Sequence, residues 1–359
     1  MRLNMFAYIL AARAVYALMW FYLAPLLPAM IQDFSVPPSE SGLMPAFFII
    51  GAAAAQIPAS WIGSKIGDIR TAGLGLFTLG IGSSLVATSP NWWTALAFRA
   101  ISGVGAGLFF STAGAALVAL RPRSAGSALG WYNASFNIGA FAGYYWGYAA
   151  HLLGWRAAAL APALLAVAMS APLIKEPGLR SSASLSWRAA KLGLASFPIW
   201  GAAYAANSLT ATWLHFYRGV PASAAGAISS ATMASGLLGG MLGSIYDRVR
   251  NKRAVPFYSA FLTAVAMAAL PLAPAEISPL LVFSYGLGYT VYITSIYAMG
   301  AKLGNPSAAL AVINVIDMSL GMGFSYVFSY TMELNPAIPW AILSALALIS
   351  ATATLRGAD

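Results

Sequence analysis

Long apolar stretches recur from one end of the chain to the other, separated by short polar segments. A helix that crosses ~30 Å of hydrocarbon needs about 20 consecutive apolar residues. The pattern predicts twelve such helices, over residues 5–30, 41–61, 71–88, 92–119, 125–150, 155–174, 191–214, 223–246, 254–273, 279–301, 307–331 and 337–355. The sequence therefore predicts an all-α membrane protein with twelve transmembrane spans, which we number 1 to 12 in chain order.

The composition agrees with a membrane protein and excludes several other classes. Hydrophobic residues make up 60% of the 359 positions and charged residues only 8%, whereas a soluble protein carries about 25% charged residues. The chain has no cysteine, two histidines and nine carboxylates. We therefore expect no disulfide, no thiol chemistry, no metal site and no bound cofactor.

The basic residues predict the orientation of the chain. If the N-terminus is cytoplasmic, fifteen of the nineteen lysines and arginines fall in cytoplasmic segments, as the positive-inside rule requires. Both termini are then cytoplasmic in a multi-pass protein of the plasma membrane. The net charge of +10 is explained by this topology, so we expect no nucleic-acid partner.

A polar segment at the midpoint divides the spans six and six. It covers residues 175–187 and predicts an N-terminal bundle over 1–174, a cytoplasmic linker over 175–187 and a C-terminal bundle over 188–359. The segment 60–70, after span 2, is similar to the segment 243–253, after span 8, at an offset of 183 residues. Two duplicated halves with substrate bound near the midplane are a common plan for secondary transporters.

The repeated segment resembles a loop motif of the major facilitator superfamily, roughly Gly-x-Leu-Ala-Asp-Arg-x-Gly-Arg-Arg. The first copy keeps Lys65, Gly67 and Arg70, but Ser60 and Ser64 stand where the family has Gly and Asp. In the second copy the matching residues are Gly243, Asp247, Arg248, Lys252 and Arg253. In the family this loop is a charge-mediated latch between the halves. The resemblance therefore implies a gating role for Lys65, Arg70, Asp247 and Arg248, with a weaker latch in the first half.

Three further motifs carry the same resemblance at the expected spans. Span 4 has Arg99 followed by Gly103, Gly105 and Gly107, span 5 has Gly130, Gly139 and Gly143, and span 6 begins with Gly154-Trp155-Arg156. Tyr144 stands where the family's span-5 antiporter motif has proline. The resemblance implies twelve helices in two pseudo-symmetric six-helix bundles, a monomer, and a central cavity lined by spans 1, 4, 7 and 10.

Arg13 is one of three charged residues within predicted spans. A charge at the centre of a membrane helix costs at least ~2.5–3.5 kcal/mol, so it is a functional candidate by default. Tyr16 and Trp20 follow Arg13 at i+3 and i+7 and share its helix face. A cation beside two aromatic rings suits an anionic or zwitterionic solute. The alternatives are a structural ion pair, or an arginine whose head reaches the interface.

Asp317 is the one carboxylate predicted inside the hydrocarbon, with Asn314 and Gly321 on its helix face in span 11. A carboxyl group balanced between burial and a nearby arginine can take up and release a proton. We expect Asp317 to carry a coupling proton or to open a pair with Arg13 when substrate arrives. The alternative is a permanent pair that only fixes packing.

Arg99 in span 4 matches an arginine that the family associates with proton coupling. The alternative is a helix-end arginine bonded to carbonyl groups of neighbouring spans.

Aromatic and amide side chains form stripes on other spans. They are Asn133 and Asn137 on span 5, Trp200, Tyr204 and Asn207 on span 7, and Tyr285, Tyr289 and Tyr292 on span 10. Spacing of three or four residues places each stripe on one helix face. The set favours the lining of a polar, aromatic substrate cavity, although for any single ring helix packing is the stronger interpretation.

These features predict a secondary active transporter that moves a small organic anion, such as a carboxylate, across the plasma membrane by alternating access, coupled to protons. An anion is favoured because the spans hold two cations and one acid. One alternative is proton-coupled export of hydrophobic drugs, and another is a non-transporting membrane receptor of the same fold. The sequence contains no nucleotide-binding loop and no convergent catalytic set, so we expect neither ATP drive nor an enzyme.

Overall fold

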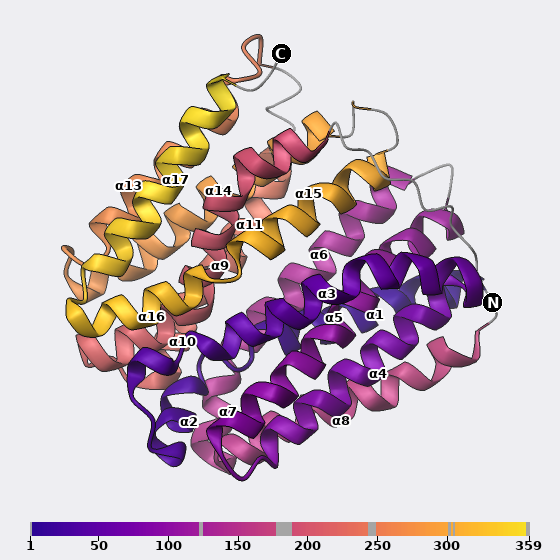
Figure 1. Ribbon diagram of the computed structural model, residues 1–359, viewed down its shortest axis with the longest axis horizontal. Helices are drawn as coiled ribbons and strands as arrows, with labels where there is room; N and C mark the ends of the chain where they lie inside the picture. The colour runs from indigo at the N-terminus through magenta and orange to yellow at the C-terminus, as the bar shows by residue number, and fades with distance from the viewer. Residues whose placement is uncertain are drawn as a thin grey trace. The chain divides into compact units, whose positions relative to one another are not determined.

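The computed structural model describes residues 2–121, 125–176, 189–242, 249–300, 303 and 306–356, and helices dominate it (Figure 1). The chain forms two compact units. Unit 1 comprises Met1–Phe34 and Phe47–Ala183, and unit 2 comprises Ser35–Ala46 and Ser184–Asp359. The predicted linker over 175–187 falls almost wholly outside the described residues, so the predicted bundle boundaries stay a prediction.

In the described part of spans 1 to 6 there are eight α-helices. They are α1 (Arg2–Phe21), α2 (Leu27–Phe34), α3 (Leu43–Ile66), α4 (Asp68–Ala87), α5 (Trp92–Leu120), α6 (Ala125–Tyr144), α7 (Trp146–Leu153) and α8 (Trp155–Lys175). Glycines with positive φ make the tightest connections, because only glycine adopts that backbone without strain. Gly67 joins α3 to α4 with φ 96°, and Gly154 joins α7 to α8 with φ 77°.

Spans 7 to 12 are built in the same way. They are α9 (Ala190–Arg218), α10 (Ala222–Ser229), α11 (Ala231–Leu242), α13 (Ala254–Ala269), α14 (Ser278–Gly300), α15 (Pro306–Gly321), α16 (Phe324–Leu334) and α17 (Ile338–Arg356). Two short 3₁₀ helices, η1 (Pro38–Glu40) and η4 (Ala275–Ile277), precede α3 and α14. In unit 2, η1 packs against α16, where the Ser329 hydroxyl donates to the Ser39 carbonyl at 2.6 Å.

Helix packing repeats between the two units. In unit 1, α4 packs against α5 and α8, and α1 packs against α6. In unit 2, α13 packs against α14 and α17, which lie side by side with it in Figure 1, and α9 packs against α15. The span pairs 3–4, 3–6 and 1–5 therefore recur six spans later as 9–10, 9–12 and 7–11. The internal repeat in the sequence corresponds to a repeated, pseudo-symmetric arrangement of helices.

Within the residues that the structure describes, four spans are interrupted at positions where the sequence predicted single apolar stretches. Span 1 breaks between α1 and α2, span 5 at Tyr145, span 8 at Ser230, and span 11 between α15 and α16. The break in span 1 contains Pro25, which lacks a backbone N–H and disfavours helix at the residue before it. Pro162, in contrast, lies inside the continuous helix α8. The other three breaks carry no proline and were not predicted.

The described helices are suited to a membrane by length and composition. Seven of them are long and apolar enough to cross, and two shorter apolar helices cover Met5–Phe21 and Ala254–Ala269. Together they correspond to spans 1–4, 6 and 9–12. Spans 5 and 8 are each divided into two pieces, and span 7 is α9, a helix of 29 residues that contains many polar side chains.

Glycines allow the helices to approach each other closely, as expected where association depends on van der Waals fit. A Cβ atom at Gly139 of α6 would overlap the Ala14 carbonyl oxygen of α1, and one at Gly105 of α5 would overlap the backbone of α4 at Leu79. A Cβ atom at Gly130, also in α6, would meet nothing within 4 Å.

We expect Gly139→Ala to lower the free energy of unfolding by about 1–3 kcal/mol, because the new methyl group forces α1 and α6 apart. The matched control is Gly130→Ala in the same helix, which should be neutral or slightly stabilising because alanine favours helix over glycine. Thermal unfolding of the two variants in detergent checks this. Equal unfolding midpoints would contradict the close packing of α1 and α6.

Candidate functional site

Arg13 lies inside a cage of aromatic rings in unit 1. The guanidinium carbon is 4.0 Å from the centroid of Tyr132, 4.6 Å from those of Tyr16 and Phe136, and 5.0 Å from that of Phe110. Three helices supply these rings, α1, α5 and α6. Cation–π attraction of this kind is strongest when the cation is removed from water, and only 2% of the surface of Arg13 is exposed.

The cage depends on close packing of span 5 against span 1. Gly139 and Gly143 bring the backbone of α6 against α1. The Tyr132 hydroxyl donates to the Phe110 carbonyl at 2.7 Å and ties α6 to α5. Contacts with α1 and α5 therefore hold the aromatic rings of α6 in place without a bound solute.

The guanidinium of Arg13 retains hydrogen-bonding capacity. Its Nε and Nη1 atoms are buried and have no hydrogen-bond acceptor among the described residues, although the nearby Tyr16 hydroxyl interacts with it electrostatically. The one ion pair in the described part of the chain is Arg156 with Asp33, at 2.9 Å. Arg13 is thus a buried cation whose charge is met by ring faces rather than by a carboxylate of its own unit.

Tyr16 and Trp20 continue the aromatic packing along α1. Tyr16 stacks on Phe109 with centroids 4.7 Å apart, and Trp20 meets Phe48 edge-on at 4.9 Å. Both are buried. Both rings therefore take part in helix packing. A role of Tyr16 and Trp20 in binding a solute stays a prediction.

Arg99 lies where α1 ends. Its Nη1 and Nη2 atoms donate to the carbonyl oxygens of Met19 and Trp20, at 3.4 and 3.3 Å. The Ala24 N–H bonds three residues back, to Phe21, at 2.9 Å, so the Trp20 carbonyl loses the donor it would have in a continuous helix. Arg99 replaces it, and its guanidinium carbon lies 3.9 Å from the ring centroid of Phe48. This geometry matches the carbonyl-binding alternative, and the proton-coupling role stays a prediction.

Asp317 is fully buried in unit 2. Its Oδ1 atom accepts a hydrogen bond from the Ser196 hydroxyl of α9 at 2.7 Å. Its Oδ2 atom has no hydrogen-bond partner among the described residues. The phenols of Tyr289 and Tyr292 on α14 lie within electrostatic reach of it. Because Arg13 belongs to unit 1, pairing of Arg13 with Asp317 stays a prediction.

The aromatic residues of spans 7 and 10 make contacts inside unit 2. Trp200 and Tyr204 stack with centroids 5.4 Å apart and an angle of 13°. The Tyr204 hydroxyl donates to the Pro45 carbonyl at 3.1 Å. Tyr285 is fully buried and shares a hydrogen bond with Thr210 at 3.2 Å. For Tyr285 these contacts favour packing, and the cavity-lining role of the set stays a prediction.

The amides predicted to line the cavity differ in their surroundings. The Asn314 Oδ1 atom accepts from the Tyr297 hydroxyl at 2.7 Å, and its Nδ2 atom donates to the Leu310 carbonyl at 2.9 Å. Asn207 is buried, Asn137 is partly buried and Asn133 is exposed. Asn314 is therefore held in place by its own unit, whereas the side chain of Asn133 is exposed.

The first copy of the loop motif makes contacts within unit 1. The Lys65 ammonium lies 3.7 Å from the ring centroid of Trp61. The Nε atom of Arg70 donates to the Ile174 carbonyl at 3.0 Å. Asp247 and Arg248 of the second copy lie outside the described residues, so the latch stays a prediction.

Several residues of these clusters were missed from the sequence. They are Phe110, Tyr132 and Phe136 around Arg13, and Ser196 beside Asp317. Tyr132 and Phe136 have the same i, i+4 spacing as the predicted Asn133 and Asn137, one position earlier, and that spacing was the available signal. Phe110 and Ser196 had none, because single residues on other helices show no pattern. Among the described residues no group of three or more histidine or carboxylate side chains could hold a metal ion.

Comparison with known families identifies the family to which this architecture belongs. The model of the Major Facilitator Superfamily matches residues 9–327, most of the chain. The chain belongs to the major facilitator superfamily. The predicted fold is therefore confirmed: an all-α, multi-pass membrane transporter fold of twelve spans in two pseudo-symmetric bundles.

Solved structures of superfamily members are similar over nearly the whole chain. A D-xylose–proton symporter has a TM-score of 0.79 at 14% identity and covers 99% of this chain and 97% of its own. A bacterial homologue of the human lysosomal transporter Spinster, in an inward-facing and occupied conformation, has a TM-score of 0.78 at 15% identity, with 99% and 95% covered. The xylose transporter XylE from E. coli, partially occluded and inward open, has a TM-score of 0.79 at 13% identity, with 99% of both chains covered. None of the curated proteins matches this chain in sequence. At such identities the likeness establishes the fold and not the substrate.

We expect Arg99→Met to lower the free energy of unfolding by about 1–3 kcal/mol, because two buried carbonyl groups lose their donors. Arg99→Lys should recover part of this loss, since an ammonium group can reach one carbonyl. The control is Lys191→Met, an exposed cation of span 7, which should change stability by less than about 0.5 kcal/mol. Denaturant or thermal unfolding in detergent measures all three, and a neutral Arg99→Met would contradict the capping role.

Proposed function

We propose that this member of the superfamily is a secondary active transporter that carries a small organic anion, such as a carboxylate, across the plasma membrane by alternating access, with protons as the coupling ion. The observation that carries the proposal is the state of Arg13. Within the described ranges two nitrogen atoms of the buried Arg13 guanidinium have no acceptor, and such a buried cation is costly. A carboxylate is the ligand that best complements it, because a planar guanidinium binds a carboxylate through two parallel hydrogen bonds.

The aromatic cage supports a transported ligand over a permanent one. Ring faces stabilise a cation without neutralising it, so the Arg13 charge remains available for an anion that arrives and leaves. A structural carboxylate from the same unit would remove that capacity, and the described part of unit 1 places none beside Arg13.

Proton coupling rests on the surroundings of Asp317. A buried carboxylate without a cation is several kcal/mol less favourable than a paired one. Asp317 therefore needs a proton or another positive partner while it is enclosed as it is here. A carboxyl group that must exchange its positive partner as its exposure changes can couple proton movement to alternating access. The proton symport named for the D-xylose transporter, a structural neighbour, agrees with this proposal.

Arg13→Gln should weaken binding of the transported anion about 30- to 150-fold, since charge-assisted hydrogen bonds are worth about 2–3 kcal/mol. A thermal-shift screen of purified protein against carboxylates, sugars including D-xylose, amino acids and lipophilic cations identifies the ligand class. The matched control is Arg121→Gln. Arg121 follows the end of α5, and its guanidinium carbon lies 3.8 Å from the ring centroid of Phe6. The Arg121→Gln substitution should leave the affinity for the anion unchanged.

If lipophilic cations stabilise the protein and still do so in Arg13→Gln, the protein exports hydrophobic drugs and the anion proposal is wrong. If D-xylose alone stabilises it, the protein is a sugar transporter and the anion proposal is also wrong. A ligand that binds but shows no counterflow in liposomes would make the protein a receptor.

Asp317→Asn should abolish accumulation driven by a pH gradient and leave solute counterflow at a rate close to that of the unaltered protein. Counterflow requires only that the loaded carrier changes conformation, whereas accumulation requires a proton-carrying group. The measurement is uptake into liposomes of the ligand found in the screen, with and without a pH gradient. Full accumulation by Asp317→Asn would exclude Asp317 as the proton carrier.

A further inference from the structure

The hydrogen-bond ladder of α9, the helix of span 7, is interrupted by a proline two residues after Ser196, the partner of Asp317. Pro198 lies inside α9 and has no backbone N–H, so the Leu194 carbonyl lacks its helical donor. Helices kink where a proline removes a rung or where a side chain enters the hydrogen-bond ladder. In α9, Pro198 removes one rung, and side chains from other helices bond to the ends of the next rung.

The next rung joins Ala195 to Ile199, and both of its ends have side-chain partners from other helices. The Ala195 carbonyl accepts from the Tyr292 hydroxyl of α14 at 3.1 Å. The Ile199 N–H donates to the Ser350 hydroxyl oxygen of α17 at 3.1 Å. Tyr292 and Ser350 are fully buried, and their hydroxyl groups also interact with each other. The rung can therefore open without leaving a buried polar group unsatisfied, which would otherwise cost about 1–3 kcal/mol.

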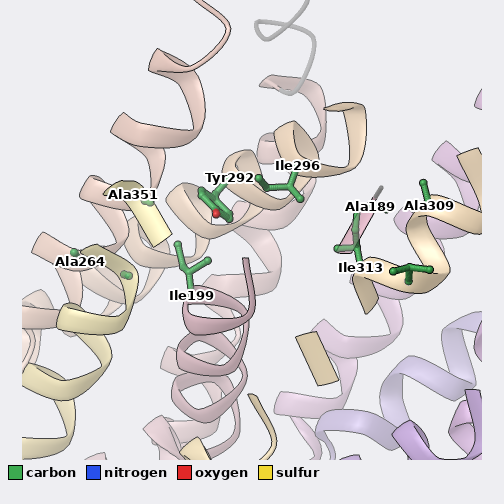
Figure 2. Close-up of a cluster of buried hydrophobic side chains, with 11 residues drawn as sticks. Ala189, Ile199, Ala264, Tyr292, Ile296, Ala309, Ile313 and Ala351 are labelled. Carbon is green, nitrogen blue, oxygen red and sulfur yellow. The ribbon is translucent and has the colours of Figure 1, made fainter. Parts of the chain in front are cut away.

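Tyr292 belongs to the apolar cluster that joins these helices. Figure 2 shows Tyr292 beside Ile199 and Ala351, which come from α14, α9 and α17. All three are buried. The hydroxyl groups that reach the rung are thus set in a packed apolar surrounding, where their hydrogen bonds are not exchanged for bonds to water.

Ser196 lies on the same turn as this rung, and its hydroxyl group has two acceptors within reach, Asp317 Oδ1 and the Gly193 carbonyl oxygen. Its hydroxyl is 2.7 Å from Asp317 Oδ1 and 3.3 Å from the Gly193 carbonyl oxygen. A hydroxyl group has one proton to donate. When Asp317 is ionised, Ser196 donates to it. When Asp317 takes up a proton, its own O–H can donate to the Ser196 oxygen, and the Ser196 proton turns to Gly193.

On the C-terminal side of Pro198, α9 packs tightly against α15. The backbones of Gly201 and Gly321 meet closely there, which restricts movement of α9 toward α15. On the N-terminal side of Pro198, the contacts with α15 include the Ser196–Asp317 hydrogen bond and the packing of Gly193 against Ile316. Because Ser196 lies between the two ends of the 195–199 rung, a small change at this rung changes the distance from Ser196 to Asp317.

We propose that Tyr292 and Ser350 are positioning residues for the coupling carboxyl: they hold the 195–199 rung of α9 and thereby set the hydrogen bond from Ser196 to Asp317. This inference rests on the proposed role of Asp317 as the proton carrier. The titratable groups that face Asp317 from the neighbouring described helices are the phenols of Tyr289 and Tyr292. Lys191, the nearest cation along α9, is exposed near the start of that helix.

The test is infrared difference spectroscopy of the full chain in lipid nanodiscs after stepwise changes of pH. A carboxyl C=O band that is absent from Asp317→Asn reports protonation of Asp317, and it needs no knowledge of the substrate. In Ser196→Ala, Tyr292→Phe and Ser350→Ala we expect the band to change frequency and its midpoint to move by about 0.5–1 pH unit, the effect of one hydrogen bond. Ser350→Thr keeps the hydroxyl and should restore the midpoint.

The matched control is Ser344→Ala. Ser344 is also a buried serine of α17, and its hydroxyl donates to the Ala264 carbonyl of α13 at 2.8 Å, so the Asp317 band should stay as it is. If Ser196→Ala moves the band but Tyr292→Phe and Ser350→Ala do not, the positioning role is wrong while the role of Asp317 stands. If no band depends on Asp317, the carboxyl does not titrate, and both the proton-carrier role and this inference fail.

Discussion

Backbone N–H and C=O groups that lie in hydrocarbon need partners within the protein, because no water is there to supply them. Helices meet this need along nearly the whole described chain. Where a helix opens, a side chain from another span takes over: Arg99 binds carbonyl oxygens at the end of α1, and Arg218 binds those of Pro271 and Ala273 after α13. At these two places the backbone of one span depends on a side chain of another.

The two units treat their buried charges differently. In unit 1 the Arg13 cation is surrounded by four ring faces, which attract it, and two of its nitrogen atoms have no acceptor in the described part of the chain. In unit 2 the Asp317 carboxyl accepts from the Ser196 hydroxyl, and its other oxygen has no partner among the residues that the structure describes. Each charge is held in place but incompletely satisfied by its own unit. Incomplete satisfaction of a buried group is unfavourable in a static fold and useful in a carrier, because a solute or an ion can complete it.

Polar side chains in this protein serve packing first. Asn314 is bound by Tyr297, Tyr285 by Thr210, and Tyr204 by the Pro45 carbonyl. In an apolar solvent a hydroxyl or amide group without a partner is costly, so most such groups find one in a neighbouring helix. A polar stripe on a membrane helix is thus a weak indicator of a substrate cavity, and atoms left without a partner are a stronger one.

The sequence by itself determined the fold class, the number of spans, the internal repeat and the three charges inside the spans, since hydrophobic length and the cost of a buried charge are properties of the chain. Only the tertiary structure decided which rings surround Arg13, that Arg99 caps α1, and that Tyr292 and Ser350 meet one rung of α9. These contacts join residues far apart in the chain, and periodicity within one helix says nothing about which residue of another helix lies opposite.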